Sequence, residues 1–86
     1  MKHATPATLD SLEPLLARIR GLEGLKETSR GTFYRKRRAF LHFHEDPQGL
    51  FADVRAADGD DFERIDVTDE AGRARLMAIT HARLAS

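Results

Sequence analysis

The sequence predicts an α+β fold, in which an N-terminal helix, a three- to four-stranded antiparallel β-meander and a C-terminal helix form a single domain over residues 1–86. Apolar residues recur at helical spacing near the N-terminus and again after Thr68, and they alternate with polar ones between Phe33 and Val67. Two turn sequences interrupt the alternating region. A chain of this length has room for one core, and it buries roughly 60–65% of its unfolded surface.

Six apolar side chains of the first helix share one stripe, which we expect to face the core: Leu9, Leu12, Leu15, Leu16, Ile19 and Leu22. Either Thr5-Pro6 or Asp10-Ser11 fits the start of this helix. Pro14 favours the later start, because proline is tolerated in the first turn of a helix and kinks the chain further in. Gly21 is expected to end the helix, and residues 1–8 are expected to be loosely ordered.

Two turn sequences fix the register of the meander. Asp46-Pro47-Gln48-Gly49 has the residues of a type I turn, and Asp58-Gly59 those of a two-residue hairpin loop. With these loops, His42 pairs with Asp53, and Asp53 pairs with Arg64. The two registers agree, and they direct one apolar face toward the core: Leu41, Phe43, Leu50, Ala52, Val54, Ile65 and Val67.

The two ends of the meander are expected to connect as follows. A strand at residues 32–35 is expected to precede the meander and to connect to it through a turn at Lys36-Arg37. Neither residue is of the type, Gly or Asn, that favours a tight turn. The second helix begins after Thr68, its N-cap, and runs to about Leu84, with acidic residues in its first turn. Its apolar residues lie on two sides, which is typical of a helix that is covered once by its own sheet and once by something else.

The same register places an unusual set of side chains on the second face of the sheet. A solvated face typically carries Thr, Lys and Glu, whereas aromatic rings and histidines here alternate with charges. This candidate binding face comprises Phe40, His42, His44, Phe51, Asp53, Arg55, Phe62 and Arg64. We expect a helix, a second subunit or a ligand to cover the rings. His42, Asp53 and Arg64 are expected to form a cross-strand ladder of hydrogen-bonded pairs.

A metal site on this face is an alternative. His42-x-His44 places two imidazoles on one side of a strand, as strand-borne zinc sites require, and Asp53 is a possible third ligand. Arg64 competes for Asp53, and His3 falls in the segment expected to be loosely ordered. We therefore predict no cofactor, and His42, His44 and Asp53 remain the ligands of the alternative.

Nucleic-acid binding is a second alternative. Arg35, Lys36, Arg37 and Arg38 form a basic turn that is suited to anions or to the phosphates of a single strand, with bases stacked on the aromatic face. Charge is strongly segregated in a chain of zero net charge: residues 18–38 hold eight bases and two acids, and residues 45–70 hold ten acids and two bases. This pattern indicates oppositely charged ends, although the acidic meander repels a phosphate backbone.

Several functional classes have no support in the sequence. The chain has no cysteine, which excludes disulfides, thiolate zinc sites and a cysteine nucleophile. There is no phosphate-binding glycine loop and no nucleophile elbow, so we predict no catalytic residue and no enzymatic activity. No apolar run approaches ~18 residues, and residues 1–8 lack the apolar region of a signal peptide. The sequence therefore predicts a cytoplasmic protein with no membrane contact.

The segment GTFYRKRRAFLHF at Gly31–Phe43, followed by an acidic turn and the strand Leu50–Arg55, resembles the MmcQ/YjbR family of small bacterial domains. In that family a hairpin with aromatic residues around a basic turn follows an opening helix. The resemblance covers about a third of the chain, which is shorter than usual for the family and lacks the tryptophan before the hairpin. It implies an α+β fold and a DNA-binding role, and it assigns no functional residue.

These patterns favour a bacterial-type, non-catalytic binding or interaction module that forms a homodimer. The chain is too short to cover the aromatic sheet face and both sides of the second helix by itself. Single-stranded nucleic-acid or DNA binding and metal binding are the alternatives.

Overall fold

A computed structural model describes residues 2–85 and confirms the α+β class. The elements, in chain order, are β1 (Lys2–His3), α1 (Pro6–Ser11), α2 (Glu13–Arg20), β2 (Lys26–Ser29), β3 (Thr32–Arg35), β4 (Arg38–Asp46), β5 (Gly49–Arg55), β6 (Phe62–Asp66) and α3 (Glu70–Leu84). The strands form one antiparallel sheet in the order β2-β3-β4-β5-β6, with β1 added to β4. None of the helices in this part of the chain is long and apolar enough to cross a membrane.

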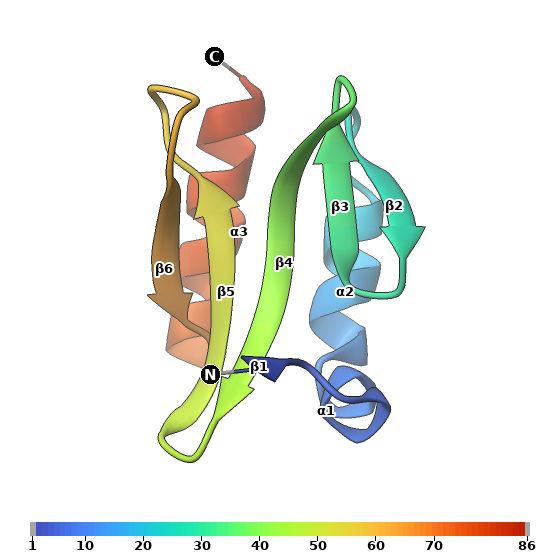
Figure 1. The fold of residues 1–86 in the computed structure, drawn as a ribbon, viewed down its shortest axis with the longest axis vertical. Coiled ribbons are helices and arrows are strands. Elements are labelled where there is room, and N and C mark those ends of the chain that lie inside the picture. The colour runs from blue at the N-terminus through green and yellow to red at the C-terminus, as the bar shows by residue number, and fades with distance from the viewer. Residues whose placement is uncertain (1, 86) are drawn as a thin grey trace.

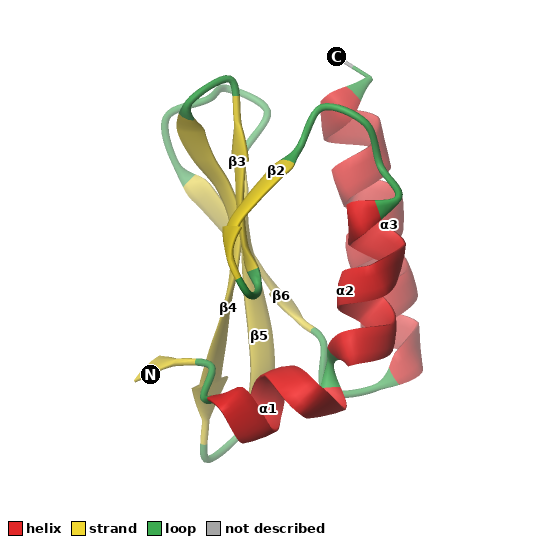
Figure 2. Cartoon of the chain, turned by 90° about the vertical axis from the view of Figure 1, so that its right-hand side faces the viewer, coloured by secondary structure: helices red, strands yellow, loops and turns green. Residues whose placement is uncertain are grey.

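The helices all lie on one side of the sheet (Figures 1 and 2). We call this side the covered face, and we call the opposite side, over which no helix of residues 2–85 lies, the open face. The core fills the space between the covered face and the helices: Leu12, Leu15, Leu16, Ile19, Phe33, Phe40, Leu41, Phe43, Ala52, Val54, Ile65, Val67 and Leu76. Apart from Phe40, the open face holds the side chains of the candidate binding face.

The first helix uses both of its expected starts. α1 begins at Pro6 behind Thr5, whose hydroxyl accepts a hydrogen bond from the Thr8 amide. The helix breaks at Leu12, and α2 begins with Pro14 in its first turn. Because Pro14 has no N–H to continue the hydrogen bonding of α1, one apolar stripe is divided between two short helices. Gly21 caps α2, as predicted.

The N-terminal segment 1–8, expected to be loosely ordered, contains β1 at Lys2–His3 and the start of α1 at Pro6; Met1 lies outside the described residues. β4 is longer than β3, so its second half leaves an edge that β1 occupies, with His3 opposite His44. The Thr5 amide donates to Oε1 of Glu45 over 2.6 Å, and the Ala4 amide donates to the Phe43 carbonyl over 3.2 Å. A strand of two residues is too short to show a periodic pattern, so it could not be predicted from the sequence.

The predicted register of the meander is confirmed, since His42 pairs with Asp53 and Asp53 with Arg64. The Asp58-Gly59 loop is wider than predicted, because the β5–β6 ladder ends at Arg55 and Phe62. The residues between Arg55 and Phe62 form hydrogen bonds within the loop itself: the Asp60 amide, for example, donates to Oδ1 of Asp58 over 3.0 Å. Strand β2 has no alternating pattern and was not predicted.

The turn between β3 and β4 lies at Lys36 and Arg37, as predicted, and both residues have positive φ angles, of 51° and 70°. Such angles suit a two-residue hairpin, although they favour Gly or Asn. The β3–β4 register then shifts between Tyr34 and Phe33, because β4 contains one extra residue. This bulge turns Phe40 into the core, where it is 3% exposed. Its predicted place on the candidate binding face is therefore wrong.

The second helix begins one residue later than predicted. Asp69 is its N-cap, accepting from the Gly72 amide over 2.9 Å, whereas the Thr68 hydroxyl accepts from the Leu50 amide over 3.0 Å. The helix starts close to the sheet, and a Cβ at Gly72 would overlap the carbonyl of Asp66.

The second apolar side of α3 is covered within the chain. The side chains of Met77, Ile79 and Leu84 are partly buried and pack against the core. The helix ends at Leu84, as predicted. The two apolar sides of α3 therefore give no reason to expect a partner outside the chain to cover this helix.

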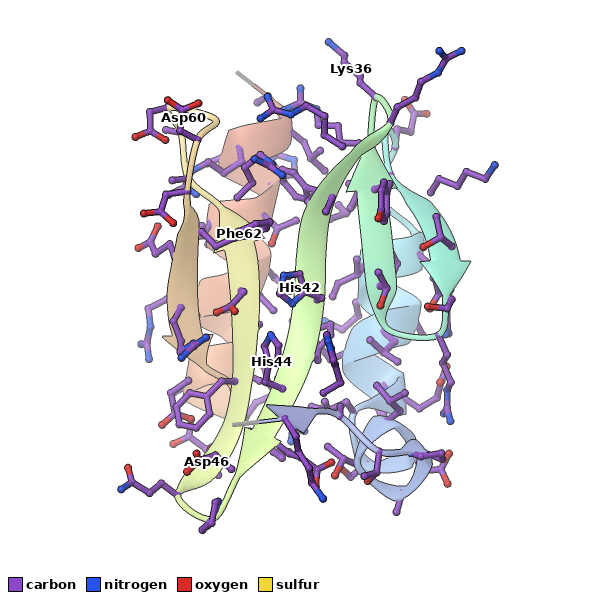
Figure 3. All side chains as sticks on the ribbon, viewed as in Figure 1. Lys36, His42, His44, Asp46, Asp60 and Phe62 are labelled. Carbon is purple, nitrogen blue, oxygen red and sulfur yellow. The ribbon has the colours of Figure 1, made fainter. Side chains whose placement is uncertain are left out.

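The basic turn and the acidic loop between β5 and β6, residues 56–61, lie at the same end of the molecule, as the positions of Lys36 and Asp60 show (Figure 3). They touch, since Nη2 of Arg38 donates to the Gly59 carbonyl over 2.7 Å. The expectation of oppositely charged ends is therefore wrong. In an antiparallel meander, alternate turns lie at the same end of the sheet, so segments of opposite charge become neighbours.

Candidate functional site

The candidate site lies at the centre of the open face, on β4, β5 and β6 (Figure 3). His42 and His44 are two residues apart on β4, and the paired residues opposite them are Asp53 and Phe51. Antiparallel partners point to the same side of a sheet, so these four side chains share the face. The register predicted this grouping from the sequence, apart from Phe40.

A third histidine, His3, joins the group from β1. It lies directly opposite His44, and the two rings stack with their centroids 5.0 Å apart. The nearest donor nitrogens of His3, His42 and His44 all lie within 4.8 Å of one another. Nδ1 of His42 is 2.8 Å from Nε2 of His44. We call these three residues the histidine cluster; sequence reasoning missed His3 because it expected the N-terminal segment to be loose.

Asp53 lies beside the cluster and is 7% exposed. Arg64 holds it with two parallel hydrogen bonds, Nε to Oδ1 over 2.9 Å and Nη2 to Oδ2 over 3.0 Å. Nε2 of His44 is 3.1 Å from Oδ2 of Asp53. The predicted ladder is therefore present between Asp53 and Arg64, but the carboxylate contacts the diagonal neighbour His44 rather than its direct partner.

The two titratable groups at the centre of the site have shifted pKa values. Burial alone would raise the pKa of Asp53, but the hydrogen bonds and charge of Arg64, with the two histidines, lower it below its ordinary value. For His42, burial is the largest cause of a lowered pKa, followed by the charge of His44. An anionic carboxylate therefore stands beside an imidazole that favours its neutral form.

The ring of Phe62 forms one wall of the site. Its centroid is 5.0 Å from that of His42, in an edge-on arrangement. The guanidinium of Arg55 lies over the Phe62 ring, 4.7 Å from its centroid. Phe51 and Phe62 are both partly exposed. The open face therefore combines apolar rings with a polar centre.

The donor set of the histidine cluster suits a transition metal. Imidazole nitrogen is a preferred ligand of zinc, copper and nickel, and three histidines with one further position are a known zinc arrangement. Zn–N bonds of about 2.0–2.1 Å place tetrahedral ligand atoms roughly 3.3 Å apart. The cluster must therefore contract from its present 4.8 Å span, and the exposed His3 is the residue most able to move. Residues 2–85 contain no other group of three or more such side chains this close together.

The four side chains of the basic turn do not form one continuous binding surface. Arg35 donates to the carbonyls of Arg83 and Leu84 at the end of α3, and Arg38 donates to Gly59 on the neighbouring loop. Lys36 and Arg37 are exposed at the tip.

The fold and the site define a small α+β domain with helices on one side of its sheet and a histidine cluster on the other. Comparisons with protein-family models, with curated proteins and with solved structures find no match. The resemblance of the hairpin to the MmcQ/YjbR family thus stays a prediction.

Proposed function

We propose that the chain is a non-catalytic binding module whose open face binds a divalent transition-metal ion, with zinc the best match, through His3, His42 and His44. The proposal rests on one observation: imidazoles from two strands that are distant in sequence converge within 4.8 Å. It replaces the expectation that no cofactor is bound. It also changes the predicted ligand set, because His3 takes the place that the sequence assigned to Asp53.

Asp53 has a supporting role in this proposal. Its carboxylate, held by Arg64, lies 3.1 Å from His44 and can orient that ring, as carboxylates behind metal-bound histidines commonly do. His42 favours its neutral form, and a histidine must be neutral to bind a metal.

Titration of the metal-free, untagged chain with Zn²⁺, followed by calorimetry, tests the proposal; Co²⁺ absorption reports the coordination geometry. We expect close to one ion per chain. His42→Ala and His44→Ala should each weaken binding by more than ~100-fold, because loss of even an outer partner costs about 10–100-fold. Asp53→Asn should weaken zinc binding by about 10–100-fold, the loss expected for an outer partner.

The fourth histidine supplies a matched control. His81 lies exposed on α3, outside the cluster. His81→Ala removes the same side chain and should leave zinc affinity unchanged. Equal loss in His81→Ala and His42→Ala, or no uptake by the unaltered chain, would refute the metal site.

Acid should release the metal, because protons compete for the imidazole nitrogens. Histidines ordinarily titrate near pH 6.5, so the apparent zinc affinity should fall by roughly 100-fold between about pH 7.5 and about pH 5.5. Because the pKa of His42 is lowered, protons compete less for this imidazole than for that of an ordinary histidine. An affinity that stays constant over this range would point to carboxylate ligands instead.

We propose self-association through the open face as the second candidate function. The observation that favours it is the pair of partly exposed rings, Phe51 and Phe62, on a face with no helix over it. Light scattering at micromolar concentration should then give the mass of a homodimer, and Phe62→Ser should shift it toward the monomer. A monomer at all concentrations, with and without zinc, would remove this candidate.

The nucleic-acid alternative has less support. Phe40 lies in the core, which removes one of the three rings expected to stack bases. The basic turn also does not offer four cations along one phosphate backbone, because Arg35 donates to carbonyls at the end of α3 and Arg38 donates to Gly59 on the β5–β6 loop.

A further inference from the structure

A second site lies at the end of the molecule where the β3–β4 turn, the β5–β6 loop and the last turn of α3 meet. These segments enclose a cleft of about 220 Å³. Among residues 2–85, the cleft is lined by no acidic residue and by four arginines: Arg35, Arg38, Arg55 and Arg83. The sequence singled out only Arg35, Arg38 and Arg55, and it placed Arg55 on a different surface. The cleft is separate from the histidine cluster.

Backbone carbonyls hold these arginines in place. Arg38 and Arg55 both donate to the Gly59 carbonyl, each over 2.7 Å, and Nε of Arg55 donates to Ala39 over 2.7 Å. Nη1 of Arg83 donates to the carbonyl of Arg55 over 2.8 Å. A carbonyl fixes the direction of a guanidinium but does not neutralise its charge, and each guanidinium keeps further N–H donors. The positive groups are therefore positioned in advance.

Two of the four arginines, Arg38 and Arg55, have no carboxylate partner among the described residues. Glu63 pairs with Arg83 over 2.6 Å. The nearby Asp58 and Asp61 accept hydrogen bonds from amides of their own loop, those of Asp60 and Phe62. The carboxylates of the loop thus have partners of their own, and the described side chains that line the cleft are positively charged or apolar.

We propose that this arginine cleft binds a phosphate group, carried either by inorganic phosphate or by a phosphate monoester of a small molecule. Guanidinium groups match phosphate oxygens with paired, charge-assisted hydrogen bonds. A phosphate carries about −1.5 to −2 charges at neutral pH, which suits several arginines better than a single carboxylate does. The volume is below the ~300–1,000 Å³ of sites for drug-sized ligands. The cleft therefore holds the charged group, and the rest of a larger ligand would lie outside.

The test is a titration of the metal-free chain by ¹H–¹⁵N NMR at constant ionic strength. Inorganic phosphate, phenyl phosphate and acetate are added in separate experiments. We expect saturable shifts for the phosphate probes, confined to the Nε–H signals of Arg55 and Arg83 and to the amides of residues 56–59. Acetate should bind at least ~10-fold more weakly, because it carries less charge and fewer oxygens than either phosphate probe.

Neighbouring arginines of the same turn provide a matched pair of variants. Both arginines are exposed, but Arg38 lines the cleft and Arg37 does not. Arg38→Gln should weaken phosphate binding about 10-fold, the usual consequence of losing one charge-assisted hydrogen bond. Arg37→Gln removes the same charge and should change the affinity by less than about twofold. If Arg38→Gln disturbs the fold, Arg55→Lys replaces it as the test variant. It keeps the charge but loses the paired hydrogen-bond geometry, so it should also weaken phosphate binding.

The outcomes separate the possible explanations. Tighter binding of phenyl phosphate than of inorganic phosphate identifies a monoester as the ligand class, and the reverse identifies the free ion. Equal weakening by Arg37→Gln and Arg38→Gln would show diffuse attraction to a basic surface and overturn the proposal. Equal binding of acetate and phosphate, or shifts that do not saturate, would overturn it as well.

Discussion

The two faces of the sheet hold their side chains in different ways. On the covered face, Leu41, Val54 and Val67 are fully buried against the helices. On the open face, residues next to them along the same strands are polar and form pairs, such as Asp53 with Arg64. A single strand therefore contributes alternately to a close-packed core and to a network of charges and rings.

This difference separates stability from function. Burying a large apolar side chain contributes about 1.5–3 kcal/mol, whereas a cross-strand polar pair contributes about 0.2–1 kcal/mol. Substitutions on the covered face should therefore act mainly on folding. Substitutions on the open face should act mainly on binding, with small effects on the free energy of unfolding.

The two faces can be compared directly with a pair of phenylalanines. Phe40 lies in the core at 3% exposure, whereas Phe62 is partly exposed on the open face. Phe40→Ala should lower the free energy of unfolding by about 3–5 kcal/mol, because it leaves a cavity in the core. Phe62→Ala should cost about 1 kcal/mol, since solvent can fill the space. Urea denaturation measures both.

The result also tests the β-bulge. If Phe40→Ala and Phe62→Ala lose similar amounts of stability, Phe40 does not point into the core, and the register shift beside it is absent. The metal proposal is independent of this outcome, because none of its ligands belongs to the β3–β4 pairing.

A smaller effect is expected from the charged pair on the open face. Asp53→Asn keeps the shape of the side chain and removes the charge that Arg64 contacts. The free energy of unfolding should fall by about 1–2 kcal/mol at neutral pH, since Asp53 is buried but Arg64 can turn to solvent. Asp60→Asn, at the exposed loop tip, should stay within about ±0.5 kcal/mol.

The pKa of Asp53 sets the pH range of this effect. Because its pKa is lowered in the folded protein, the stabilisation is fully present above the ordinary value of 3.8 and is lost as the pH falls through the folded pKa. The difference between the native chain and Asp53→Asn should therefore disappear in acid. A difference that persists there would mean that the substitution acts through packing.

The fold was predictable where the sequence combines turn chemistry with alternation. The turn at Pro47-Gln48 set the β4–β5 register, and the β5–β6 register followed although the Asp58-Gly59 loop is wider than its dipeptide suggests. The bulge at Phe40 was not predictable in this way. Nothing in the run from Arg38 to Phe43 marks an extra residue, and only packing against the helices decides which way Phe40 points.

The site was predictable only in the part that lies within the meander. His42, His44, Asp53 and Arg64 were placed together because one register argument covers all of them. His3 is brought in by a two-residue strand that depends on the unequal lengths of β3 and β4, a property of the whole sheet. Arg83 joins the arginine cleft through the packing of α3, which no local pattern encodes.

The smallest expected effect concerns a polar atom on the covered side of the molecule. Thr80 on α3 is fully buried, and its Oγ1 has no hydrogen-bond partner among residues 2–85. Thr80→Val replaces the hydroxyl with a methyl group of similar size and should raise the free energy of unfolding by about 1 kcal/mol.

Thr80→Ser provides the opposite change, because it keeps the hydroxyl and removes the methyl group. This variant should lower the free energy of unfolding by about 1 kcal/mol, the contribution of one buried methyl group. If Thr80→Val is instead the less stable variant, the hydroxyl has a partner in solution, and the covered side tolerates polar groups as the open face does. Opposite signs for the two variants would confirm that polar side chains find partners on only one side of this sheet.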